Sequence, residues 1–337
     1  MVSRIPVSIL DFCPVLEGET PRESFEQVTH LATRAENLGY KRFWVAEHHG
    51  AQTVASAATS VVISHIASKT KTIRVGAGGI MLPNHAPLVV AEQFGTLASL
   101  YPDRIDLGLG RAVGAPPGTE ELMARALRLE PDARERYVSD IRELQSYFRK
   151  PDPEQPFVVV PGSGIDVPLW LLGSSTFSAA EAGALGLPFV FATQIAPSVA
   201  GAALEKYRSN FRPSEALDCP HVMVCAFVIA ADTDEAGQYL LTSLQLTMLG
   251  RLRGHMGPLR PPVQNLEAVS TEEERTALAR FVPLAVVGSR KKVFDELDRL
   301  ITHTAADELM VLTLVYDQAA RNRSFQILTE YDGFALG

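Results

Sequence analysis

Two short segments of this chain carry residue types that bind phosphate groups. Gly173-Ser174-Ser175-Thr176 ends one apolar run and opens a helical pattern, and Arg111 follows the glycines of Gly108-Leu109-Gly110 at the end of another. Free backbone N–H groups and small hydroxyls at a helix start bind anions, and a guanidinium pairs with phosphate through two hydrogen bonds. Ser174 and Ser175 could instead form an ordinary helix cap, and Arg111 a surface ion pair. Taken together, the two segments favour an anion site.

A second polar group, Glu47-His48-His49, follows the apolar run Arg42–Ala46. An imidazole can donate or accept a proton near neutral pH. Neighbours on an extended segment point to opposite sides, so His48 and His49 cannot both face one site. For the same reason they cannot both hold one metal ion without a sharp bend in the chain, and we expect no metal site here.

Glycines gather where a third apolar run ends, in Gly76-Ala77-Gly78-Gly79. Without side chains, Gly78 and Gly79 permit the close approach of a flat ring, or simply a tight exit from a strand. Lys41 and Lys71 precede their strands, so no lysine is placed for Schiff-base chemistry, and no facing pair of carboxylates suggests a glycosidase. A site of histidine, arginine, hydroxyls and glycines is typical of a protein in which a phosphate-bearing cofactor does the chemistry.

The elements that must position these residues alternate regularly along the chain. Short β-branched runs are separated by longer helical patterns, which indicates βαβ units and a parallel sheet. Eight such strands predict one closed (β/α)8 TIM barrel, with the site at the carboxyl ends of the strands. The predicted strands are Val7–Leu10, Arg42–Ala46, Ile73–Gly78, Ile105–Leu109, Leu169–Leu172, Phe189–Ala192, Val222–Ala230 and Glu308–Leu314.

We expect residues 1–337 to form a single domain with insertions after strands four and seven. The first contains the Pro- and Gly-rich Pro151–Gly164, and the second is Gly254–Pro283, which is long enough to be a mobile lid. An open doubly wound sheet is the alternative fold. It is disfavoured because Val7–Leu10 is not followed by the Gly-x-Gly-x-x-Gly fingerprint of a dinucleotide site.

Composition excludes several other classes of protein. The 337 residues carry a net charge of −8 and no basic run, which argues against a grip on nucleic acid. Three cysteines without a Cys-x-x-Cys pair suit a reducing cytoplasm. The uncharged stretch Ala182–Leu204 contains two prolines and several glycines, so we interpret it as strand, loop and helix and not as a membrane span.

At this point the ordered motifs resemble a known family. Phe43-Trp44-Val45-Ala46-Glu47-His48-His49, Gly76 to Pro83, Gly108-Leu109-Gly110-Arg111 and Leu171-Leu172-Gly173-Ser174-Ser175 occur in the order seen in bacterial luciferase. The chain is similar to the luciferase-like flavin-dependent monooxygenases, in particular to the group akin to the alkanal monooxygenase alpha chain. The resemblance spans nearly the whole chain.

The resemblance implies a barrel that binds FMN, reduced by a separate NAD(P)H:flavin reductase, and that activates O2 as a flavin C4a-hydroperoxide to oxygenate a small organic substrate. It would place the FMN phosphate at Arg111, Ser174 and Ser175, with Ser178 as a further contact. The flavin ring would pack on Gly78-Gly79, where the family often has a cis peptide, and His48 corresponds to the family's catalytic histidine. A homodimer is also implied.

Some features depart from luciferase. Luciferase has alanines in place of Gly78 and Gly79, a cysteine at Gly110 and a glutamate at Ser174, so light emission and a long-chain aldehyde substrate do not carry over. Two alternatives stay open. One is a deazaflavin-dependent oxidoreductase on the same fold, and the other is a flavin-binding protein without turnover.

Overall fold

The protein was analysed as a computed structural model, which describes residues 4–116, 118–151, 157–255, 257–281 and 285–337. Parallel strands pair in chain order from β1 to β7, and β9 pairs with both β7 and β1, which closes the barrel. The predicted (β/α)8 barrel is therefore confirmed. Its strands are β1 (Ile5–Asp11), β2 (Arg42–Val45), β3 (Arg74–Met81), β4 (Ile105–Gly110), β5 (Leu169–Gly173), β6 (Phe189–Ala192), β7 (Val222–Ala231) and β9 (Glu308–Leu312).

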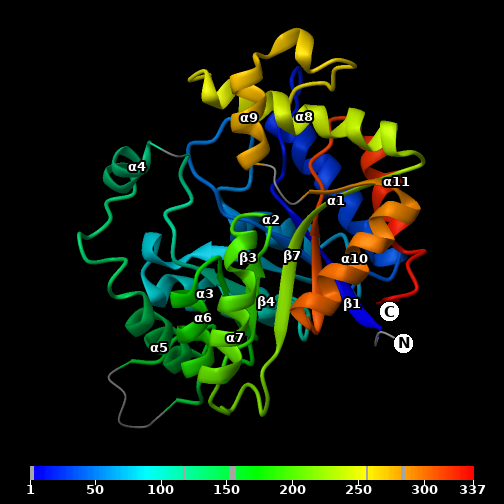
Figure 1. Ribbon diagram of the computed structural model, residues 1–337. Helices are drawn as coiled ribbons and strands as arrows, with labels where there is room; N and C mark the ends of the chain where they lie inside the picture. The colour runs from blue at the N-terminus through cyan, green and yellow to red at the C-terminus, as the bar shows by residue number, and fades with distance from the viewer. Residues whose placement is uncertain (1–3, 117, 152–156, 256, 282–284) are drawn as a thin grey trace.

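Helices cover the outside of this barrel (Figure 1). Local signals fix where they start: Thr20 and Glu23 form a reciprocal capping box at the first helix, and Pro21 occupies its first turn. The α-helices are α1 (Pro21–Asn37), α2 (Thr59–Ala67), α3 (Pro87–Leu100), α4 (Glu120–Ala126), α5 (Tyr137–Phe148), α6 (Thr176–Ala184), α7 (Ala200–Asn210), α8 (Asp234–Leu252), α9 (Glu272–Phe281), α10 (Arg290–Thr304) and α11 (Gln318–Leu328).

Two strands lie outside the barrel and were not predicted. β8 (Ala285–Ser289) pairs with the second half of β7, beyond the part of β7 that pairs with β9. β10 (Phe334–Ala335) pairs with the start of β1. Because β7 has ten residues, it extends past the closed barrel and carries β8 and the start of α8 above the carboxyl end.

The segments between β4 and β5 and between α8 and β8 are long. The first contains α4 and α5, and the second contains a short 3-10 helix (Glu267–Val269) and α9. Of the predicted lid Gly254–Pro283, Met256, Val282 and Pro283 lie outside the described residues. In Figure 1, α8 and α9 lie above the barrel and α4 lies to one side of them. None of the helices in the described part of the chain has the length and apolar character needed to cross a bilayer.

The amino-terminal end of the barrel interior holds a buried ionic cluster. Asp106 accepts hydrogen bonds from Arg42 at 2.8 Å, from the indole of Trp44 at 3.0 Å and from Arg74 at 2.7 Å. Arg42 also donates to Glu308 at 3.0 Å. Every one of these charges is paired, so the cluster closes the bottom of the barrel and leaves the opposite end for chemistry.

Candidate active site

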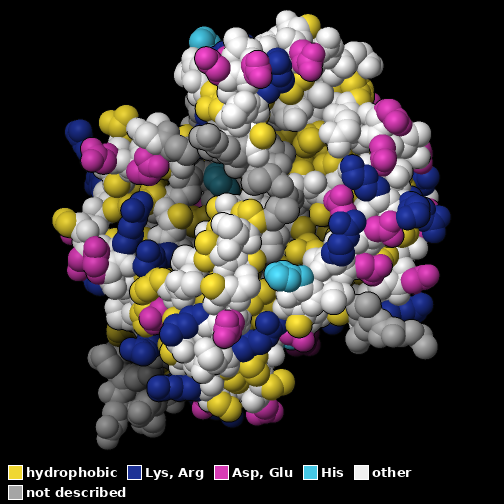
Figure 2. All heavy atoms as spheres, viewed as in Figure 1, with side chains coloured by type: hydrophobic (Ala, Val, Ile, Leu, Met, Phe, Trp, Pro, Cys, Tyr) yellow, Lys and Arg dark blue, Asp and Glu magenta, His cyan; other side chains and the backbone are white. Residues whose placement is uncertain are grey.

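The predicted site residues come together at one end of the barrel because the strands are parallel. His48 follows β2, Gly78 and Gly79 lie near the end of β3, Arg111 follows β4 and Ser174 follows β5. Figure 2 shows a hollow between the part of the molecule that carries α4 and the part that carries α8 and α9, with a histidine surface at its base. This is the end at which (β/α)8 barrels bind their ligands.

Glu47 organises the polar residues around the end of β2. Its carboxylate is buried and lies 2.8 Å from Nε2 of His49 and 2.9 Å from Nε2 of His85. It also accepts from the side-chain amide of Asn84 at 3.1 Å and from the backbone N–H of Met81 at 3.1 Å. Burial acts to raise the pKa of Glu47, but the hydrogen bonds from the two histidines outweigh it and lower that pKa to about 2. Glu47 is thus a fixed anion that ties the ends of β2 and β3 together.

His48 is placed differently from His49. It lies partly buried beside Phe12, with the two ring centroids 5.0 Å apart. Its Nδ1 atom is buried and has no hydrogen-bond partner among the described residues. Burial lowers the pKa of His48, and the charges of His49 and Arg251 act in the same direction, whereas Glu47 opposes them. The neutral imidazole of His48 is therefore favoured, and its buried Nδ1 has no partner within the described residues.

Arg111 lies against the start of α6. Its guanidinium carbon is 4.3 Å from the ring centroid of Phe177, and within the described residues it makes no hydrogen bond or ion pair. At the same helix start, the backbone N–H groups of Thr176 and Phe177 have no acceptor in the described part of the chain. An unpaired cation and free amide donors, held together by a cation–π contact, form the kind of arrangement that binds an anion.

The predicted serines occupy this helix start in different ways. Ser175 is the N-cap of α6 and its Oγ accepts from the backbone N–H of Ser178 at 3.3 Å. Ser178 is buried, and its hydroxyl donates to the carbonyl of Ser175 at 3.0 Å. Ser174 precedes the cap and is partly exposed. The ordinary capping role considered from the sequence is therefore present at Ser175, together with the neighbouring free amides.

The two glycines of β3 have a packing role. The Gly78–Gly79 peptide bond is cis. A Cβ atom on Gly78 would lie 2.5 Å from Cδ1 of Leu10, and one on Gly79 would lie 2.7 Å from the carbonyl oxygen of Gly108. The absence of side chains is thus required by contacts within the barrel itself. The glycines alone do not indicate a cofactor.

A buried ion pair supports the first strand at this end. Arg321 on α11 donates to Asp11, and the other oxygen of Asp11 accepts from the backbone N–H of Cys13 at 2.6 Å. Burial and the charge of Asp11 raise the pKa of the Cys13 thiol well above its ordinary value. Cys13 is therefore an unreactive packing residue. Among the described residues, no three His, Cys, Asp or Glu side chains are arranged to hold a metal ion.

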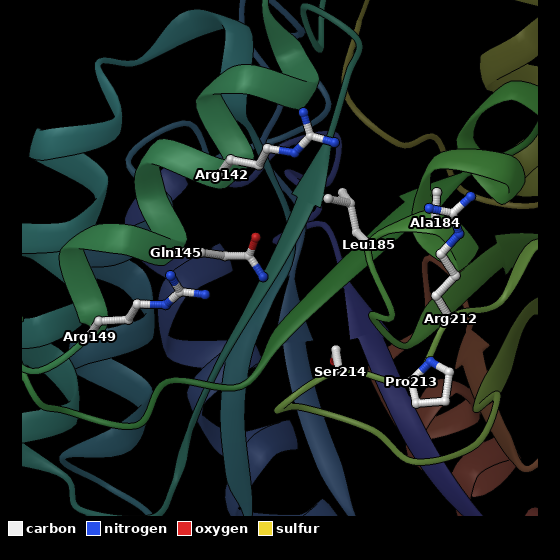
Figure 3. Close-up of a pocket in the computed structure, with 8 residues that line it drawn as sticks. All are labelled: Arg142, Gln145, Arg149, Ala184, Leu185, Arg212, Pro213 and Ser214. Atoms are coloured by element: carbon white, nitrogen blue, oxygen red, sulfur yellow. The ribbon is translucent and has the colours of Figure 1, made fainter.

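A separate surface cleft of about 480 Å³ lies away from this site, between α5 and the residues after α7 (Figure 3). Figure 3 shows Arg142 and Arg149 on one side of it and Arg212 on the other. None of the predicted site residues lines this cleft.

Sequence reasoning missed four participants at the barrel end. His85 and Asn84 bind Glu47, Phe177 stacks on Arg111, and Arg251 acts electrostatically on His48. The position of Glu47 directly after an apolar strand indicated a role at the barrel end. Its partners Asn84 and His85 lie 37 and 38 residues further along the chain, so the sequence alone did not identify them.

A parallel (β/α)8 barrel that gathers a histidine, an arginine and a free helix N-terminus at the carboxyl ends of its strands has the architecture of a barrel enzyme. The chain belongs to the luciferase-like monooxygenase family, whose sequence model matches residues 7–308. Members of this family are enzymes, and several relatives are named monooxygenases.

Several relatives match almost the full chain. The YvbT protein of Bacillus subtilis (strain 168) is 48% identical and covers 96% of both chains. A luciferase-like monooxygenase of Escherichia coli (strain K12) is 44% identical, over 99% of this chain and 98% of the relative. The N-acetyl-S-alkylcysteine monooxygenase of Bacillus subtilis (strain 168) is 30% identical, over 97% of this chain and 98% of the relative.

Solved structures share the fold. Apo-MsnO8 superposes with a TM-score of 0.85 at 35% identity and covers 99% of this chain and 100% of that chain. The oxygenating constituent of 3,6-diketocamphane monooxygenase from Pseudomonas putida, solved in complex with FMN, has a TM-score of 0.73 at 17% identity and covers 99% and 100%. An F420-dependent secondary alcohol dehydrogenase has a TM-score of 0.68 at 15% identity and covers 97% and 98%. Structural neighbours thus bind either FMN or the deazaflavin F420.

Proposed function

We propose that this protein is an FMN-dependent, two-component monooxygenase that oxygenates a small organic substrate. The observation that carries the proposal is the unpaired Arg111 beside the free amides of α6, at the same barrel end as His48. Arg111 and the free amides of α6 suit the FMN phosphate, and His48 suits proton transfer at the reacting atoms. The relative named N-acetyl-S-alkylcysteine monooxygenase and the neighbour solved with FMN support the same function.

The residues present fit such a cofactor. Bound reduced FMN supplies the two electrons that allow O2 to deliver one oxygen atom to the substrate and the other to water. The chain's own contributions are to hold the phosphate at Arg111 and Ser174, to pack the ring near Gly78 and Gly79, and to hold or release a proton at the imidazole of His48. Ser175 and Ser178 fix the start of α6, so they keep the free amides in place.

The electrons come from a partner. The barrel has no dinucleotide fingerprint after β1. A separate NAD(P)H:flavin reductase therefore supplies reduced FMN, and both proteins work in the cytoplasm. The three cysteines, all free thiols, are consistent with that compartment.

Two features of the assembled protein are part of this proposal. The segment 254–283 acts as a lid. The backbone N–H of Leu259 donates to the carbonyl of Val15, and the carbonyl of Leu259 accepts from the N–H of Glu17. These bonds hold Leu259 against the loop after β1, at the carboxyl end of the barrel. The protein is a homodimer, because Val61 of α2 and Val89 and Leu100 of α3 are large apolar side chains left exposed on neighbouring helices. Limited proteolysis with and without FMN tests the lid, and light scattering tests the dimer.

The test of the function uses the purified protein, FMN and an unrelated flavin reductase. The protein with FMN alone should oxidise negligible NADH. With the reductase and 18O2, a panel of thioethers, including N-acetyl-S-methylcysteine, and of cyclic ketones should give product carrying one 18O atom. Rapid NADH oxidation by the protein itself contradicts the two-component reaction. Tight binding of F420 with none of FMN favours the deazaflavin alternative, and FMN binding without any 18O product across the panel favours a flavin-binding protein.

A further inference from the structure

One charged side chain at the barrel mouth has no assigned role. Arg251 lies in the last turn of α8. Upstream on this helix, Leu240, Leu244 and Met248 pack against the apolar cluster inside the barrel. Residues three and four apart share a helix face, so Arg251 continues that face where α8 reaches the rim. Figure 1 shows α8 lying above the barrel.

The guanidinium of Arg251 is partly buried, yet it makes no hydrogen bond or ion pair within the described residues. Burial lowers the pKa of Arg251, and the only opposing influence is the charge of Glu120 on α4. No ion pair joins Glu120 to Arg251. Arg251 acts in turn on His48, whose pKa it lowers. Arg251 is thus a cation at the rim of the barrel, on the α8 face that packs over its interior.

Arg253, two residues further along the chain, does have partners, unlike Arg251. Arg253 donates to Glu274 at 2.7 and 2.8 Å and to the carbonyl of Val269 at 2.9 Å, and so fastens α8 to the segment before β8. The two arginines therefore differ in role. Arg251 is only partly buried, so its guanidinium keeps contact with water, and an anionic ligand would replace that water with two charge-assisted hydrogen bonds.

Two buried carboxylates at this end of the barrel, Glu47 and Asp11, already have partners and do not pair with Arg251. Glu47 is saturated by His49, His85 and Asn84. Asp11 is bound to Arg321 and to the backbone of Cys13. The proposed FMN phosphate lies at Arg111, after β4, whereas Arg251 comes from the helix after β7.

We propose that Arg251 binds a carboxylate on the organic substrate and thereby orients the oxidisable group toward His48. This inference rests on the proposed function and narrows its substrate class to small organic acids. A guanidinium binds a carboxylate through two parallel hydrogen bonds, which fixes the direction of the ligand as well as its position. In this arrangement Arg111 binds the phosphate of the cofactor and Arg251 binds the carboxylate of the substrate.

The test compares carboxylates with their primary amides on the FMN-loaded protein and on the apoprotein. The probes are N-acetyl-S-methylcysteine, hexanoate and phenylacetate. Binding is followed without NADH, through the 13Cε1 resonance of His48 in histidine-labelled protein and by calorimetry. The wild-type protein should bind at least one carboxylate about 10- to 100-fold more tightly than its amide. Arg251→Gln should remove that preference and raise the pKa of His48, whereas Arg251→Lys should keep part of it.

Arg142→Gln is the matched control, because it removes an exposed guanidinium from α5 and should leave the preference intact. Equal binding of acid and amide by the wild type overturns the proposal, and so does a preference that survives in Arg251→Gln. A loss of FMN affinity in Arg251→Gln equal to the loss of carboxylate affinity also overturns it, because Arg251 would then belong to the cofactor. Since binding is measured without turnover, a carboxylate preference without any 18O product separates failure of the proposed function from failure of this inference.

Discussion

Glu47 lies 2.8 Å from Nε2 of His49, and this contact distinguishes two adjacent histidines. His49 is committed to a buried carboxylate, whereas Nδ1 of His48 has no partner among the described residues. The two adjacent histidines thus have different surroundings, with His49 paired to Glu47 and His48 packed beside Phe12.

His48→Ala should retain the fold and FMN affinity but lose oxygenation. General acid–base help contributes typically ~100- to 10,000-fold, so we expect a rate loss in that range, with reduced FMN reoxidised to release hydrogen peroxide. Stopped-flow absorbance of the flavin, 18O product and a peroxide assay measure this. His49→Ala should instead lower stability by about 1–3 kcal/mol, because it removes a donor from buried Glu47, and should affect oxygenation less. A His48→Ala protein that oxygenates at the parent rate makes His48 structural.

Arg111→Ala should weaken FMN binding by about 10- to 150-fold, because hydrogen bonds to charged groups are worth roughly 1.5–3 kcal/mol. Its contact with Phe177 positions the guanidinium, so Phe177→Leu should give a smaller loss. Fluorescence titration of FMN measures both, with Arg142→Ala as the control for lost positive charge. Unchanged FMN affinity in Arg111→Ala would remove this residue from the site.

Glu47→Gln should reveal a pH-dependent part of the folding free energy. The pKa of Glu47 is lowered in the folded protein from 4.5 to about 2. A depressed carboxyl pKa contributes stability that is complete above the unfolded value and is lost as the pH falls through the folded one, here about 3 kcal/mol. The advantage of the wild type over Glu47→Gln should therefore be constant above about pH 5 and shrink toward pH 2. Urea unfolding across this range tests it, and an advantage independent of pH contradicts it.

Asp106→Asn should destabilise the protein by about 3–5 kcal/mol, because it leaves buried Arg42 and partly buried Arg74 without their shared anion. Asp132→Asn, which loosens an exposed pair with Arg136, should cost less than about 1 kcal/mol. Chemical unfolding followed by tryptophan fluorescence compares the two. Equal effects of the two substitutions would show that the interior cluster contributes no more than a surface pair.

The barrel could be predicted because its strands are buried, β-branched runs at regular intervals. β8 has as many residues as β5 and β9 but was missed, because it ends in Gly288-Ser289 and, among the described residues, pairs only with the extension of β7. The stretch from Thr119 to Phe148, whose composition favours a helix, does not form a single helix in the structure. Pro131 cannot sit inside a helix, and Arg128 adopts a left-handed φ of 56°, so the stretch divides into α4 and α5.

Within the site, what could be predicted was what each strand end carries. Arg111 and Ser175 are adjacent to strands, so the barrel topology brought them together. His85 also follows a strand, but its pairing with Glu47 could not be predicted, because that contact joins two different strand ends. Arg251 reaches the rim from the end of α8, whose path depends on tertiary packing. Glu47 precedes His48 in the sequence, but its function depends on those distant partners.

The length of β7 has a consequence for how this enzyme family could diversify. The first half of β7 belongs to the barrel and pairs with β6 and β9. The second half extends beyond the barrel and pairs with β8. The stretch that connects β7 to β8, which includes α8 and α9, therefore begins and ends at this extension. Differences in the sequence of this stretch therefore leave the strand pairing of the barrel unchanged, but they alter the α8 side chains that pack over its interior.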